Sequence, residues 1–151
     1  GILTSSGDAP GMNAAIHAAH AAVKFNTAYS IDCIVFNAAT TVLAKRVAIA
    51  VGHSIKHICQ LGGNTKDYAA PGFSLAVAAS NICSHELDGL IVIGGDGCFR
   101  GTLALAAHTL VPIIGIPGTI DKDTAGTDIT LGFQSAVQTA TEATDKIRDT
   151  A

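Results

Sequence analysis

The chain has 151 residues, of which 48% are hydrophobic and 14% charged, and its formal net charge is −3. This length suggests one domain with a buried core, and the charge argues against nucleic acid or a membrane surface as a partner. No apolar run is long enough to cross a bilayer. The four cysteines match neither a zinc pattern nor a disulfide framework, which favours reduced thiols in a cytoplasmic protein.

The first half of the chain begins with a predicted strand at residues 1–5, followed by a glycine-containing turn. Asp8 is a candidate N-cap and Pro10 suits the first turn of the helix that follows. Met12, Ile16 and Val23 then recur at helical spacing. After this helix, the patterns indicate a strand at 31–36, a helix from about residue 43 and a loop at 61–67.

A predicted helix at residues 74–85 leads to the most informative stretch. Residues 90–93 are an apolar, β-branched run typical of a strand buried on both faces. Gly94, Gly95, Asp96 and Gly97 follow, and a helical pattern continues to residue 107. A strand, a glycine turn and a helix together suit phosphate binding, because glycines allow close approach and the helix N-terminus is positive.

Asp96 has two interpretations. A carboxylate that faces phosphates suggests Mg²⁺, which bridges carboxylate and phosphate oxygens. The alternative is a tight strand–helix turn in which Asp96 is only a helix cap.

The next strand is predicted at residues 111–118, and Thr119, Asp121 and Asp123 follow it directly. One carboxylate could accept a proton from an attacking hydroxyl while the other helps to hold a metal. A polar surface turn is the alternative. A final helix is predicted at 132–149.

Strands alternate with helices along the whole chain. This predicts an α/β fold, a three-layer, mostly parallel, doubly wound (Rossmann-like) sheet with helices on both faces. In such sheets ligands bind beyond the carboxyl ends of the strands. The loops at 5–11, 94–98 and 117–123 would all lie at that edge.

Three segments resemble the ATP-dependent 6-phosphofructokinases, in matching order and spacing. They are Gly-Ile-Leu-Thr-Ser-Ser-Gly-Asp-Ala-Pro-Gly-Met-Asn-Ala-Ala-Ile (1–16), Val-Ile-Gly-Gly-Asp-Gly (92–97) and Ile-Pro-Gly-Thr-Ile-Asp (116–121). The resemblance implies a single nucleotide-binding domain over residues 1–151, the N-terminal part of a longer phosphofructokinase. It implies phosphoryl transfer from Mg-ATP to fructose 6-phosphate in glycolysis, by a cytoplasmic homo-oligomer.

The resemblance also implies roles for individual residues. Gly7 would contact the nucleotide, and the turn of Gly95, Asp96, Gly97 and Cys98 would hold the ATP phosphates, with Asp96 on Mg²⁺. Thr119, Ile120 and Asp121 would meet the sugar phosphate, with Asp121 as the base. Asp123 is the candidate second metal ligand. Gly97 and Gly118 match the ATP-using branch of the family rather than the pyrophosphate-using branch.

Several positions depart from the family pattern. Ser6 replaces a usual Gly, Cys98 a usual Ser or Thr, and Lys122 a usual Asn, and residues 68–71 lack the expected phosphate-binding Arg. A cation at Lys122 would lower the proton affinity of Asp121 or take the place of the metal. Of the effector-site arginines only Arg148 has a match, so we expect no effector control.

These departures keep two other interpretations open. The first is a non-catalytic nucleotide-binding, phosphate-binding or assembly module. The second is a sugar, lipid or NAD kinase that shares only the Gly-Gly-Asp-Gly turn, which leaves the match at 116–121 without an explanation.

Overall fold

The structure, a computed structural model, describes residues 1–4, 9–26, 35–37, 75–84 and 86–150. The elements in chain order are β1 (Ile2–Thr4), α1 (Met12–Asn26), β2 (Val35–Asn37), α4 (Leu75–Ser84), β3 (Leu90–Gly94), α5 (Asp96–Ala106), β4 (Ile113–Thr119), β5 (Leu131–Gly132) and α6 (Phe133–Arg148).

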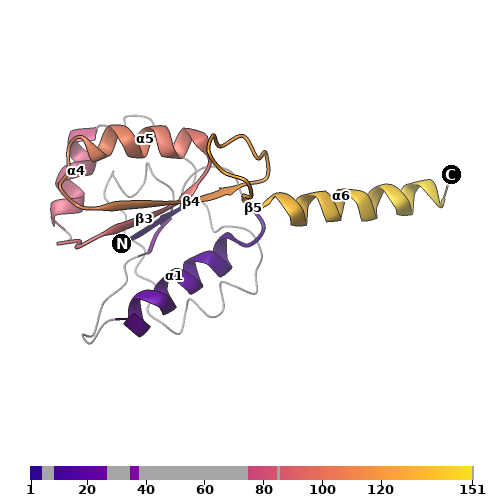
Figure 1. The fold of residues 1–151 in the computed structure, drawn as a ribbon, viewed down its shortest axis with the longest axis horizontal. Coiled ribbons are helices and arrows are strands. Elements are labelled where there is room, and N and C mark those ends of the chain that lie inside the picture. The colour runs from indigo at the N-terminus through magenta and orange to yellow at the C-terminus, as the bar shows by residue number, and fades with distance from the viewer. Residues whose placement is uncertain (5–8, 27–34, 38–74, 85, 151) are drawn as a thin grey trace.

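The strands form one sheet in the order β2-β1-β3-β4-β5, and each pair of neighbours is parallel. Helices α4 and α5 lie over one face of this sheet and α1 lies over the other (Figure 1). The predicted α/β class, with a parallel sheet between two layers of helices, is therefore confirmed. The strand order reverses direction between β1 and β3, the kind of position where ligands bind in open α/β sheets.

Each face of the sheet carries its own apolar cluster because successive strand side chains point to opposite faces. Leu3 and Val92 belong to a cluster with residues of α4 and α5. Ile2 and Ile93 belong to a second cluster, which contains Met12 and other residues of α1. Val92, Ile93 and Met12 have essentially no exposed surface. The prediction that residues 90–93 form a strand buried on both faces is confirmed, and this strand is the centre of the core.

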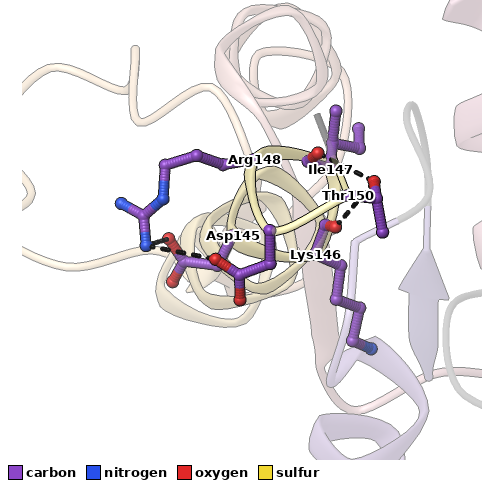
Figure 2. Close-up of polar contacts among 6 residues, drawn as sticks. Asp145, Lys146, Ile147, Arg148 and Thr150 are labelled. Carbon is purple, nitrogen blue, oxygen red and sulfur yellow. Dashed lines mark hydrogen bonds and ion pairs between the residues drawn. The ribbon is translucent and has the colours of Figure 1, made fainter.

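Helix α6 differs from the other helices. It runs outward from the end of the sheet (Figure 1), and none of its side chains is buried. Its large apolar side chains include Val137 and Ile147, which are exposed at 46% and 69%. Near its C-terminal end, Nη2 of Arg148 lies 3.4 Å from Oδ1 of Asp145, and the Thr150 hydroxyl donates a hydrogen bond to the carbonyl oxygen of Ile147 at 2.9 Å (Figure 2). Local contacts of this kind hold the helix end without tertiary packing.

Some details differ from the sequence-based expectations. Pro10 lies in the turn before α1 rather than in its first helical turn, because the helix begins at Met12. Strand β4 begins at Ile113, directly after Pro112. This boundary is expected because proline has no backbone N–H to donate to a neighbouring strand. The short strand β5 was not predicted. The predictions for Asp8, for residues 31–34 and for residues 43–67 lie outside the described residues.

None of the helices in the described part of the chain is both long and apolar enough to span a membrane.

Candidate nucleotide-phosphate site

Three polar segments meet at the carboxyl edge of the sheet. Gly94, the last residue of β3, is in register with Pro117 of β4, so β4 extends two residues beyond β3. The N-terminal ends of α1 and α5 and the segment after β4 all lie at this one end of the sheet (Figure 1). For the described residues of the loops at 5–11, 94–98 and 117–123, the predicted grouping at one edge of the sheet is therefore confirmed. Gly7 itself lies outside the described residues, as does the whole segment 5–8.

The described part of the first loop is a tight entry into α1. Ala9 is buried, and its carbonyl oxygen accepts a hydrogen bond from the Met12 N–H at 3.2 Å. Gly11 has φ of +93°, a left-handed conformation that strongly favours glycine. This glycine therefore fixes the path by which the loop enters the helix.

The second loop is the turn from β3 into α5. Gly95 is the N-cap residue, and no side chain caps the helix. Asp96 is the first residue of α5, so the alternative prediction that it serves as the cap is wrong. Its side chain is 33% exposed, and Oδ2 lies 2.8 Å from Nε of Arg100, one helical turn later. The carboxylate is thus accessible at the positive end of the helix, where the helix dipole favours anions.

Gly97 leaves room beside this turn. A Cβ built on Gly97 would meet no atom within 4 Å, so the packing of the protein does not require glycine here. Cys98, by contrast, is partly buried and packs against the apolar cluster of α4 and α5. A thiol suits that contact because it behaves as a small apolar group. The role predicted for Cys98 in phosphate binding would therefore fall to its backbone at the helix N-terminus.

The third loop leaves β4 and returns to the sheet at β5. The Thr119 hydroxyl accepts a hydrogen bond from the Asp121 N–H at 3.2 Å. The Thr119 carbonyl oxygen accepts another from the hydroxyl of Thr130, a residue that is only 2% exposed, at 2.8 Å. Thr119 is therefore held from both sides. Asp121 and Asp123 remain exposed at the mouth of the loop.

Lys122 lies between these two aspartates in the chain, but its ammonium group lies over the ring of Phe133. Its backbone φ is +53°, and its Nζ lies 5.3 Å from the centroid of the Phe133 ring. Among the residues that the structure describes, Lys122 forms no ion pair with Asp121 or Asp123. The expected interference of this cation with the carboxylates is therefore not visible in the geometry.

The junction between β5 and α6 connects the third loop to the first. A Cβ built on Gly132 would lie 2.9 Å from Ala9 Cβ and 3.1 Å from the backbone nitrogen of Pro10. Its φ of +99° also strongly favours glycine. Because Gly132 pairs with Thr119 in the sheet, a single glycine contacts the entry to α1 and lies beside the exit of β4.

The donor set fits magnesium better than a transition metal. In the described ranges, no three His, Cys, Asp or Glu side chains gather as a metal-binding group. Mg²⁺ is commonly bound by one or two carboxylates together with phosphate oxygens and water. Asp96 and Asp123 are the carboxylates that would serve.

Sequence reasoning missed the contacts of Arg100, Phe133 and Gly132. The ion pair of Arg100 was detectable, since a residue four positions after Asp96 on a helix lies beside it. The contacts of Phe133 and Gly132 join residues that no local pattern connects.

The fold and these loops define an α/β domain with a ligand site at the carboxyl edge of its parallel sheet, of the kind that binds phosphate groups at helix N-termini. The family model described as Phosphofructokinase matches residues 1–151, and the chain belongs to the phosphofructokinase family. It is 41% identical to ATP-dependent 6-phosphofructokinase 1 of Thermus thermophilus, over 100% of this chain and 48% of the relative.

Other relatives agree with this assignment. ATP-dependent 6-phosphofructokinase 2 of Bacteroides thetaiotaomicron is 39% identical, over 100% of this chain and 47% of the relative. The solved structure of phosphofructokinase from Saccharomyces cerevisiae has a TM-score of 0.77 and 28% identity, over 99% of this chain and 24% of that chain. The chain thus spans about half the length of the curated relatives that it matches.

Proposed function

We propose that this chain forms the nucleotide-binding part of an ATP-dependent 6-phosphofructokinase. The reaction is phosphoryl transfer from Mg-ATP to fructose 6-phosphate, which gives fructose 1,6-bisphosphate and ADP in cytoplasmic glycolysis. The observation that carries the proposal is the adjacency of the turn that follows β3 and the exit of β4, set by the pairing of Gly94 with Pro117. The relatives from Thermus thermophilus and Bacteroides thetaiotaomicron both have ATP-dependent 6-phosphofructokinase in their names.

Each segment has a role in this proposal. Gly7 and the turn at 95–98 bind the nucleotide phosphates through backbone N–H groups, which are directed outward at the start of a helix. Asp96 and Asp123 would hold Mg²⁺, which neutralises phosphate charge when bound. The accessible carboxylate of Asp96 supports this role.

The acceptor side of the site is the exit of β4. Asp121 accepts the proton of the attacking sugar hydroxyl. The hydroxyl oxygen bonds to the γ-phosphorus as the bond between this phosphorus and ADP breaks. Thr119 and Ile120 position the sugar phosphate. The two hydrogen bonds that hold Thr119 support a positioning role, because one fixes the Thr119 carbonyl group and the other joins the Thr119 hydroxyl to the Asp121 N–H.

The first experiment is calorimetry of Mg·ATP binding, with Asp96→Ala as the test variant. We expect the variant to lose Mg²⁺-dependent affinity. Asp88→Ala is the control, because Asp88 is an exposed aspartate that precedes β3, at the opposite end of that strand from Asp96. Equal binding by Asp96→Ala and the wild-type protein would contradict the assigned metal ligand.

The second experiment separates the base from the nucleotide site. Asp121→Ala is expected to abolish fructose 6-phosphate phosphorylation and to leave Mg·ATP affinity nearly unchanged. Full activity in that variant would rule out Asp121 as the base.

A second candidate function is nucleotide or phosphate binding without turnover. The observation that favours it is the ion pair of Arg100 with Asp96, which uses one of the two carboxylate oxygens of the proposed metal ligand. Measurable ATP-dependent turnover by the chain would exclude this candidate.

We also propose that the protein is a homo-oligomer. Several large apolar side chains are exposed, among them Ile114 at 64% and Ile129 at 70%, and exposed apolar surface favours association. Sedimentation should show self-association, and a monomer across the accessible concentrations would contradict it.

A further inference from the structure

Arg100 is the cation that the structure places beside the proposed metal ligand. Its Nε lies 2.8 Å from Oδ2 of Asp96, and its side chain is 79% exposed. A side chain in a helix leans toward the helix N-terminus. The guanidinium of Arg100 is therefore carried back toward the glycine turn at 95–97.

Stability alone gives little reason for a cation at this position. An exposed pair of this spacing contributes little to folding. The helix dipole favours cations in the last turn of a helix, yet α5 has no basic residue there and carries Arg100 in its second turn. The charge thus lies near the positive end of the helix, where an anionic ligand would offset the unfavourable interaction.

The guanidinium keeps most of its donors available in this arrangement. Five N–H bonds belong to a guanidinium, and the ion pair is made through Nε. The terminal amino groups of the exposed side chain form a planar fork that matches two phosphate oxygens. The contact with Asp96 holds this fork at the edge of the turn.

We propose that Arg100 binds phosphate oxygens of the nucleotide, with Asp96 positioning its guanidinium. The inference rests on the proposed function and adds to it a phosphate-binding residue. It also supplies a guanidinium to a site whose segment 68–71 contains no arginine. Asp96 then serves two partners, Arg100 on one side and Mg²⁺ on the other.

The test is ATP binding by calorimetry in excess EDTA, so that no metal contributes, and again with Mg²⁺. Arg100→Ala is expected to raise the Kd of metal-free ATP about tenfold or more, because a charge-assisted hydrogen bond is lost. Arg100→Lys should raise it by less, since a lysine keeps the charge and loses the fork. Lys146→Ala is the control, since Lys146 is also an exposed cation and lies near the end of α6.

The dependence on salt provides a second readout. Loss of a cation that contacts the phosphates should flatten the decrease of ATP affinity with ionic strength, whereas loss of a distant surface cation should not. Thermal unfolding of each variant establishes that it is folded. Arg100→Lys serves as the test variant if Arg100→Ala is not folded.

The outcomes separate this inference from the proposed function. If the wild-type protein binds ATP and Arg100→Ala binds it equally well in EDTA, the role of Arg100 is overturned and the proposed function stands. An equal loss in Lys146→Ala would also overturn it, because the effect would then reflect net charge. If the wild-type protein binds neither ATP nor Mg·ATP, both the proposed function and the role of Arg100 are overturned.

Discussion

The ring of Phe99 lies directly against Gly115. A Cβ built on Gly115 would come within 2.8 Å of Phe99 Cε1, closer than packed carbon atoms approach one another. Gly115 is in register with Val92 in the middle of β4, and Phe99 is in the first turns of α5. The missing side chain at Gly115 therefore lets α5 lie close to the sheet and sets the position of the turn at 95–97.

Gly115→Ala should consequently destabilise the protein. Gly115 is exposed and Phe99 is partly buried, so the ring can shift, and we expect a loss of about 1 kcal/mol in the free energy of unfolding, the low end for an added group that displaces its neighbour. Urea denaturation measures it, and Phe99→Leu in the same background should recover part of the loss. Additive effects of the two substitutions would contradict a direct contact, since residues in contact are energetically coupled.

Gly97→Ala should separate binding from folding. The position faces open space, so the substitution should leave stability unchanged or raise it by up to about 1 kcal/mol, as for a helical glycine. The added methyl group would occupy the space proposed for phosphate and weaken Mg·ATP binding in calorimetry. Gly101→Ala, which also meets no atom within 4 Å, is the control for stability. Unchanged nucleotide affinity in Gly97→Ala would exclude close approach of a ligand at this residue.

Lys122→Met tests whether the lysine disturbs the carboxylates around it. Because its Nζ lies over the Phe133 ring, removal of the charge should leave Mg²⁺ and Mg·ATP affinities within about twofold of wild type, a change of ~0.4 kcal/mol. The stability loss should be about 0.5–1 kcal/mol, the contribution of an exposed cation–π contact. A large gain in Mg²⁺ affinity would show that the ammonium competes with the metal.

Thr124→Val concerns a buried hydroxyl. Thr124 is 8% exposed, and its Oγ1 has no hydrogen-bond partner among the described residues. Valine has the same shape without the polar atom, so the substitution should be neutral or stabilise the fold by about 1 kcal/mol. Thermal unfolding measures the change. A clear decrease in stability would show that the hydroxyl is satisfied, for instance by bound water.

The parts of the site that depend on residues close together in the sequence were predictable. The glycine run after residues 90–93 predicted the turn, and the polar residues after 111–118 predicted the exposed carboxylates of Asp121 and Asp123. The alternative interpretation of Asp96 as a helix cap was wrong, because Gly95 is the N-cap residue and the Asp96 carboxylate pairs with Arg100 one turn later; local propensity does not choose between the two arrangements. The orientation of Lys122 was not predictable, since it depends on Phe133 across a returning loop.

The sequence by itself determined the class of fold, the alternation of strands and helices and the three polar loops, because apolar spacing and glycine placement act over a few residues. It also carried the family resemblance, which the comparisons confirm. Only the tertiary structure decided the strand order, the pairing of β4 with β5 and the contact of Gly132 with Pro10. These features join segments that are remote in the chain, and their geometry is set by the packing of both partners at once.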